Sequence, residues 1–162
     1  MRKILITILA VTVFGVGAAF AQGMAAESYW VGLSAGYPGG QIHFGVSDVA
    51  PGVSVRANLG YGYFGYGFSV GVDGMYNLPV DTGDLPITVY AGLGPSASFG
   101  YSYGTYSNAT SVGVKLFAGA EYRLGQVGFE PGGVFFEAGP MVTFVPEFRF
   151  DPVARLGFNY HF

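Results

Sequence analysis

The sequence of 162 residues has no cysteine, and only 10% of its residues are charged. Without cysteine, disulfide cross-links, thiolate metal sites and a lipid-modified N-terminal cysteine are all excluded. Soluble domains carry about 25% charged residues, so the shortage of charge argues against an ordinary water-facing surface. Beyond its N-terminal segment the chain also lacks an apolar run of about 20 residues, which excludes a bundle of transmembrane helices.

Apolar, aromatic and glycine residues are abundant instead. The hydrophobic residues amount to 51% and the aromatic residues to 17% of the sequence, which excludes a disordered chain. The 28 glycines follow no three-residue period, which excludes collagen. This composition predicts β-strands in contact with lipid.

Residues 1–21 have the layout of a cleavable signal peptide. The basic pair Arg2-Lys3 precedes an apolar run over 4–19, and Ala19-Phe20-Ala21 fits a cleavage site. We predict that cleavage leaves residues 22–162 as one domain. The alternative is an uncleaved anchor helix, which the glycines inside the run disfavour.

The predicted mature chain is acidic. The signal peptide removes two basic residues, so the remaining 141 residues carry five basic and ten acidic side chains, a net charge of −5. A nucleic-acid partner is therefore not expected, because such binding depends on neutralising phosphates with basic residues.

The mature chain alternates apolar residues with small or polar ones. Strict alternation predicts strands with two different faces. We expect eight of them, the smallest usual number for a bacterial outer-membrane barrel. The predicted strands cover 28–35, 41–46, 53–63, 66–77, 87–94, 111–122, 134–144 and 154–162.

One change in the alternation indicates a tight turn. The apolar positions switch from odd to even numbers at Phe64-Gly65. A two-residue hairpin there pairs Tyr63 with Tyr66 and keeps both on one face of the sheet. Strands of about 10 residues leave roughly 60 residues for connections, among them an outer connection from Pro146 to Pro152.

The charged residues decide which face meets lipid, because a Lys or Arg facing mid-bilayer costs about 2–4 kcal/mol. All the charges within the strands belong to the small or polar set, so the apolar set is expected to point outward. Large inward side chains such as Trp30, Tyr90 and Phe117 then need glycine opposite them. The inward charges are Arg56, Asp73, Lys115, Glu121, Glu137 and Arg155.

A soluble, lipocalin-like barrel is the alternative, and it would need the opposite orientation of the two faces. It would leave a continuous apolar belt on the outside. The aromatic residues also favour the membrane, because they form two groups at opposite strand ends, as interfacial girdles do. The group expected on the periplasmic side is Tyr29, Tyr76, Tyr122, Tyr160 and Phe162, and the opposite group is Tyr61, Tyr63, Tyr66, Phe68 and Phe144.

The last residues carry the most specific motif. Arg155 is followed by Gly157 and by aromatic residues third from last, Tyr160, and last, Phe162. This resembles the C-terminal assembly signal of bacterial outer-membrane barrels, which the barrel assembly machinery recognises. With the signal peptide, it makes residues 27–162 similar to the outer membrane protein beta-barrel domain family, the small OmpA- and OmpX-like barrels. The resemblance implies an all-β, eight-stranded, antiparallel up-and-down transmembrane barrel in the outer membrane.

The six inward charges predict how the interior is filled. Three are basic and three acidic, and unpaired charges in so narrow a lumen would be poorly solvated. We therefore expect a plug of ion pairs made by these six residues, and a structural role in the cell envelope. The alternatives are a narrow channel for small solutes and a barrel that binds a lipid or small ligand.

Nothing in the sequence predicts an enzyme, a cofactor or a metal site. The motifs H-E-x-x-H and the P-loop are absent. The only histidines, His43 and His161, fall on different strands and are expected at opposite heights, which makes a poor metal site. They are interpreted as hydrogen-bonded fillers.

The most distinctive outer loop is rich in tyrosine, serine and glycine. Tyr101, Tyr103 and Tyr106 are candidate contacts for another envelope protein, because such residues make adaptable surfaces. The alternative is a girdle that extends past the membrane. The other expected partners are outer-membrane lipid and, during biogenesis, the barrel assembly machinery.

Overall fold

The computed structural model of the chain describes residues 29–62, 67–101 and 108–162. Among these residues no helix is long and apolar enough to cross a bilayer, a finding that does not bear on strands. The described elements are β1 (Tyr29–Tyr37), β2 (Gly39–Ala50), β3 (Val53–Gly62), β4 (Gly67–Asn77), β5 (Ile87–Tyr101), β6 (Asn108–Arg123), the short 3₁₀ helix η1 (Leu124–Val127), β7 (Gly132–Val145) and β8 (Arg149–His161). The predicted signal peptide lies outside the described residues.

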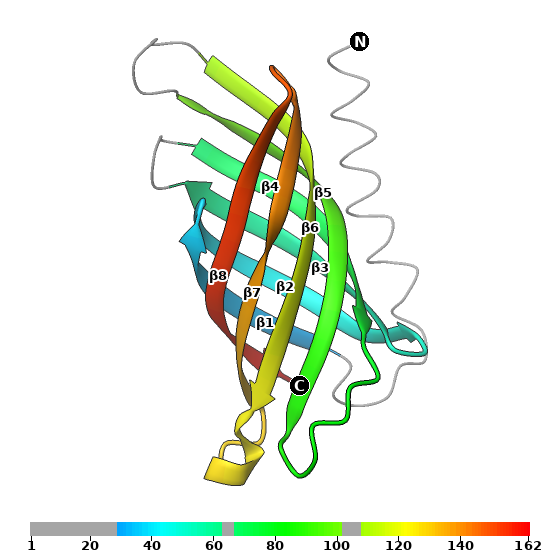
Figure 1. Cartoon of the computed structure of the whole chain (residues 1–162). Helices are drawn as coiled ribbons and strands as arrows, with labels where there is room; N and C mark the ends of the chain where they lie inside the picture. The colour runs from blue at the N-terminus through cyan, green and yellow to red at the C-terminus, as the bar shows by residue number, and fades with distance from the viewer. Residues whose placement is uncertain (1–28, 63–66, 102–107) are drawn as a thin grey trace.

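The eight strands form one closed antiparallel barrel in which each strand pairs with its neighbours in sequence (Figure 1). The first and last strands close it, with the register Trp30 to His161 through Tyr37 to Ala154. The predicted all-β, eight-stranded, up-and-down architecture is confirmed. Closure leaves no unpaired sheet edge, which is the condition for a sheet to lie in lipid.

The connections gather at two ends of the barrel. We call the end with the first residue of β1 and the last of β8 the terminal end. It also carries the β2–β3 turn, loop 78–86 and η1, and it lies at the bottom of Figure 1. The opposite, far end carries the other connections. The predicted Phe64-Gly65 turn lies outside the described residues; the pairing of β3 with β4 runs unbroken up to Tyr61 and Phe68.

Several strands are longer than predicted, and two of them run through a proline. β5 continues through Pro95 to Tyr101, and β8 begins at Arg149, inside the predicted connection from Pro146 to Pro152. The ladder between β4 and β5 is interrupted opposite Pro95, whereas the ladder between β5 and β6 runs through it. A proline is tolerated where its missing N–H would have faced a gap in the pairing.

The two faces of the barrel are as the alternation predicts. Leu33 and Leu156 are each 60% exposed on the outside, whereas the inward Asp73 and Glu137 are 0% exposed. The alternative of a soluble, lipocalin-like barrel is therefore wrong, because it needs the apolar residues inside.

Glycines make room for the large inward side chains. Trp30, Tyr90 and Phe117 each have a glycine as their cross-strand partner on one neighbouring strand, as predicted. A Cβ atom on Gly45 would overlap the indole ring of Trp30, and one on Gly119 would lie 2.8 Å from Cζ of Tyr90. The large aromatic side chains inside the barrel therefore pack directly against the backbone of these glycines.

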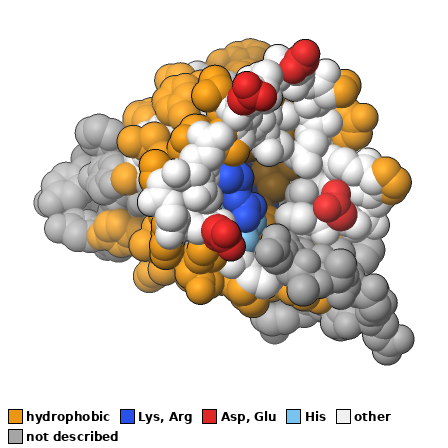
Figure 2. All heavy atoms as spheres, turned by 90° about the horizontal axis from the view of Figure 1, so that it is seen from below, with side chains coloured by type: hydrophobic (Ala, Val, Ile, Leu, Met, Phe, Trp, Pro, Cys, Tyr) orange, Lys and Arg blue, Asp and Glu red, His pale blue; other side chains and the backbone are white. Residues whose placement is uncertain are grey.

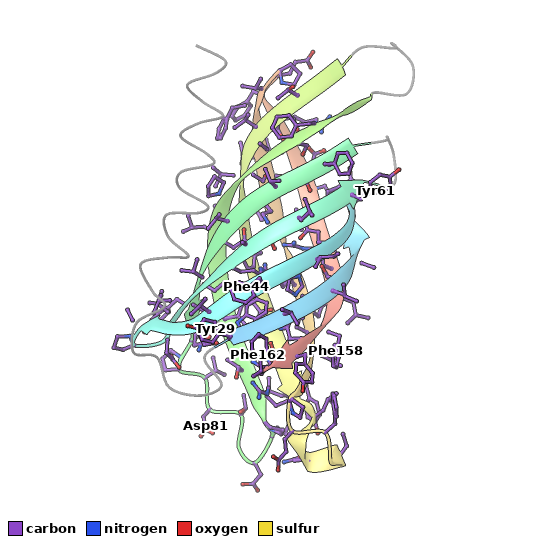
Figure 3. The ribbon with its side chains drawn as sticks, turned by 180° about the vertical axis from the view of Figure 1, so that it is seen from behind. Tyr29, Phe44, Tyr61, Asp81, Phe158 and Phe162 are labelled. Carbon is purple, nitrogen blue, oxygen red and sulfur yellow. The ribbon has the colours of Figure 1, made fainter. Side chains whose placement is uncertain are left out.

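Exposed aromatic residues lie toward both ends of the outer surface. In Figure 3, Tyr29 and Phe162 lie near the terminal end, and Tyr61 lies near the other. Tyr76 and Tyr160 belong with the first group and Phe68 and Phe144 with the second; all four are exposed. Such paired belts are typical of proteins that sit in a bilayer. Tyr63 and Tyr66 lie outside the described residues.

The outward belt yields a direct test. Leu116, in the middle of β6, is 54% exposed and lies opposite the equally outward Leu93. In lipid vesicles, Leu116→Lys is expected to lower the free energy of unfolding by about 2–4 kcal/mol, because the ammonium would face hydrocarbon. Urea unfolding measures this. The control is Val80→Lys in the exposed loop 78–86, and an equal loss for both variants would contradict a membrane-facing β6.

Candidate functional site in the barrel interior

Two cross-strand ion pairs face each other inside the barrel. Arg56 on β3 lies directly opposite Asp73 on β4, and their closest atoms, Nη2 and Oδ2, are 2.8 Å apart. Glu137 on β7 lies opposite Arg155 on β8, with Oε2 and Nη2 separated by 3.0 Å. The two residues of each pair lie directly opposite each other on neighbouring antiparallel strands, and this register keeps their side chains side by side.

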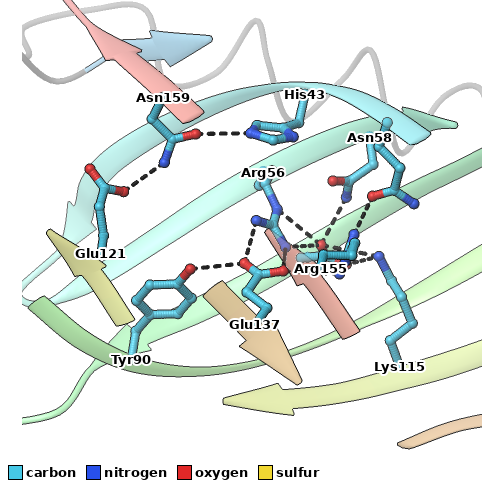
Figure 4. Close-up of polar contacts among 11 residues, drawn as sticks. His43, Arg56, Asn58, Tyr90, Lys115, Glu121, Glu137, Arg155 and Asn159 are labelled. Atoms are coloured by element: carbon cyan, nitrogen blue, oxygen red, sulfur yellow. Dashed lines mark hydrogen bonds and ion pairs between the residues drawn. The ribbon is translucent and has the colours of Figure 1, made fainter. Parts of the chain in front are cut away.

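A third ion pair joins the two across the lumen. The guanidinium of Arg56 donates to both carboxylate oxygens of Glu137, with 3.0 Å between Nη2 and Oε2. Lys115 on β6 contacts the other acid, Asp73, at 2.9 Å. All five side chains are buried. They form one continuous interaction, which we call the central network (Figure 4).

Neutral side chains complete the hydrogen bonding of the two acids. The Tyr90 hydroxyl donates to Glu137 at 3.0 Å, and the Asn58 amide donates to Asp73 at 2.8 Å. Arg155 also donates to the side-chain amide oxygen, Oε1, of Gln41. Buried ion pairs persist only when such additional bonds satisfy the remaining lone pairs.

Five of the six predicted plug residues belong to the central network, and Glu121 does not. Glu121 accepts hydrogen bonds from the Asn159 amide at 2.6 Å and pairs with His161 at 2.6 Å. Asn159 in turn contacts His43 at 2.9 Å. This second group lies nearer the terminal end, because Asn159 and His161 lie closer than Arg155 to the end of β8.

The expectation that the two histidines lie at opposite heights is wrong. His43 is level with Asn159, because Gly32 of β1 pairs with both of them, and His161 lies only two positions further along β8. They are connected through Asn159 and Glu121. Parity along each strand placed both histidines inside, but their relative height depends on how the last strand registers against the first.

The central network separates two cavities. A cavity of about 210 Å³ on the terminal side is lined by Arg56 and Glu121, among others. A smaller cavity of about 40 Å³ on the far side is lined by Lys115 and Arg155. In Figure 2, which looks into the terminal end, basic side chains and a histidine lie within the hollow and acidic ones lie on the rim.

The residues of the predicted assembly signal take different places on β8. Arg155 points inward to the central network, whereas Tyr160 and Phe162 lie outward and exposed. The last residue also closes the barrel, since the backbone N–H of Phe162 donates to the carbonyl of Tyr29 at 2.9 Å. Of the predicted loop contacts, Tyr103 and Tyr106 lie outside the described residues, as does the side chain of Tyr101.

In the described part of the chain, no group of three or more histidine or acidic side chains is placed to hold a metal ion. The polar residues that sequence reasoning left out of the site are Tyr90, Asn58, Asn159 and Gln41. Their inward parity was visible in the sequence. What was missing was the register that brings them level with the charges.

Comparison with known proteins supports the fold. The chain is similar to the N-terminal β-barrel domain of Pseudomonas aeruginosa OprF, known from a crystal structure. The TM-score is 0.62 at 13% sequence identity, and the match covers 86% of this chain and 100% of that domain. No family model and no curated protein sequence matches the chain.

Proposed function

We propose that this chain is an integral outer-membrane barrel whose lumen is closed by the central network and whose role in the cell envelope is structural. The outward apolar belt and the similarity in fold to the OprF barrel domain support the membrane location. The terminal end would then face the periplasm. A structural rather than enzymatic role fits an interior whose charged groups are engaged with one another.

The proposal that the lumen is closed rests on how many strands contribute to the central network. Its five charged side chains come from β3, β4, β6, β7 and β8, and they meet inside the barrel. Phe117 packs with them, since its ring lies 5.2 Å from the Arg56 guanidinium and 5.9 Å from that of Arg155. A solute would have to break several buried ion pairs in order to pass.

A narrow channel is the second candidate, and the two cavities favour it. They approach the central network from opposite sides, so a rearrangement of this one layer would join them. The assembly role of the C-terminal residues and a protein contact through the tyrosine loop are further parts of the proposal.

Conductance across a planar bilayer distinguishes the candidates. The unmodified protein is expected to show no steady current, whereas Glu137→Ala is expected to open discrete conducting steps, because Arg56, Arg155 and Tyr90 lose their shared acceptor. Glu147→Ala, in the exposed connection between β7 and β8, is the matched control and should stay silent. Steady open steps from the unmodified protein would instead establish the channel.

A further inference from the structure

The central network has an unbalanced formal charge. Its members are three cations, Arg56, Lys115 and Arg155, and two carboxylates, Asp73 and Glu137. The sixth inward charge, Glu121, was expected to balance them, but it is engaged with Asn159 and His161 instead. One net positive charge is therefore buried at the centre of the barrel, where leaving it uncompensated costs several kcal/mol.

Two of the three cations of the central network face the far-side cavity. Both Lys115 and Arg155 line it, and none of its described lining residues is acidic. The other polar lining residues are Gln41, Asn58, Ser69, Ser96 and Ser98. The cavity therefore offers two cations, hydroxyls and amides, which is the donor set that an anion requires.

Several of these donors do not bond to another side chain. Within the described chain, Nε of Arg155 has no hydrogen-bond partner, and the hydroxyl groups of Ser69 and Ser98 make no hydrogen bond to another side chain. Lys115, by contrast, contacts both oxygens of Asp73. Unsatisfied buried donors usually mark a bound water or ion.

No other acid is in a position to supply the missing charge from the far end. Asp151 lies toward this end on the inward face of β8, but its carboxylate is paired with Arg149 at 2.6 Å. Glu147 is exposed. The segments 63–66 and 102–107, which lie outside the described residues, contain no acidic residue in their sequence.

We propose that the far-side cavity binds a small inorganic anion of the halide class, with Lys115 and Arg155 as its counter-charges. The volume of about 40 Å³ limits the ligand, because a single water already needs about 10–15 Å³. A monatomic anion with a water fits this space, whereas a bulky organic acid does not. The proposal concerns charge balance and is independent of whether the barrel conducts.

Thermal unfolding in detergent micelles tests it. The purified protein is compared in sodium chloride, sodium bromide and sodium isethionate at one ionic strength, since isethionate is too large for the cavity. A halide that binds only the folded state should raise the unfolding midpoint by roughly 3 °C or more, and progressively with its concentration. Crystals grown in bromide should show anomalous scattering between Lys115 and Arg155.

The Lys115→Gln variant should lose the halide dependence, because it removes the excess charge while Asp73 keeps Arg56 and Asn58 as partners. Arg123→Gln, which lines the other cavity, should keep the dependence. Equal midpoints in all three salts for the unmodified protein, with no bromide at the site, would overturn the proposal and indicate a neutral Lys115. If Lys115→Gln does not fold, the unmodified salt series and the bromide map still decide.

Discussion

Glu137→Ala is expected to lower the free energy of unfolding by about 3–5 kcal/mol, the usual cost of removing one partner from a buried ion pair. Its carboxylate is fully buried and is shared by Arg56, Arg155 and the Tyr90 hydroxyl. Without it the excess positive charge of the central network rises from one to two. Urea unfolding of the protein in lipid vesicles measures the loss.

Two further variants separate charge from packing. Glu137→Gln keeps the shape of the side chain and removes only its charge, so most of the loss should remain. Glu147→Ala removes an exposed acid ten residues along the chain and should change stability by less than about 0.5 kcal/mol. A loss below about 1 kcal/mol for Glu137→Ala would mean that water enters the lumen and solvates the two guanidiniums.

The sequence predicts contacts between neighbouring strands of this interior better than contacts between strands that lie far apart in the barrel. Alternation along a strand decides which residues point inward, and the six charges that it predicted to be inward are buried or nearly buried inside the barrel. A short hairpin then fixes pairing between neighbours. The register that brings Arg56 level with Asp73 is the one that a turn at Phe64-Gly65 demands.

Contacts across the lumen cannot be predicted in this way. The pairing of Arg56 with Glu137 joins β3 to β7, and it depends on the tilt and stagger of the whole closed sheet. No local pattern encodes that geometry. For the same reason Glu121 was grouped with the other charges, and the two histidines were expected to be far apart.

Strand ends were mispredicted for a local reason. The predicted fifth strand stopped at Gly94, just before Pro95, and Pro152 was assigned to a connection. Proline cannot donate to a ladder, but that does not end a strand. In the barrel a strand has two ladders, and one of them can be interrupted while the other continues. Pro95 lies at such an interruption between β4 and β5. Sequence alone does not show on which side the missing donor falls.

The other substitution with a large expected effect on folding is at Gly45, which lies opposite Trp30. Gly45→Val is expected to prevent folding, because even its Cβ would overlap the indole ring of Trp30. The ring has little freedom to move, since it is 3% exposed and packs edge-on against His43 at 5.3 Å between ring centroids. Overpacking a closed core costs about 1–3 kcal/mol for modest insertions and more for larger ones. Electrophoresis of unheated samples should show loss of the shifted, folded band.

The matched control is Gly74→Ala, on β4. A Cβ there has open space, with its nearest neighbour, the Leu93 carbonyl oxygen, 4.0 Å away, so the folded band should remain. A rescue variant then isolates the contact: Gly45→Val combined with Trp30→Ala should fold again, because the new side chain occupies part of the space that the indole leaves. If the double variant stays unfolded while Trp30→Ala alone folds, the requirement for glycine lies in the β2 backbone rather than in the room that Trp30 needs.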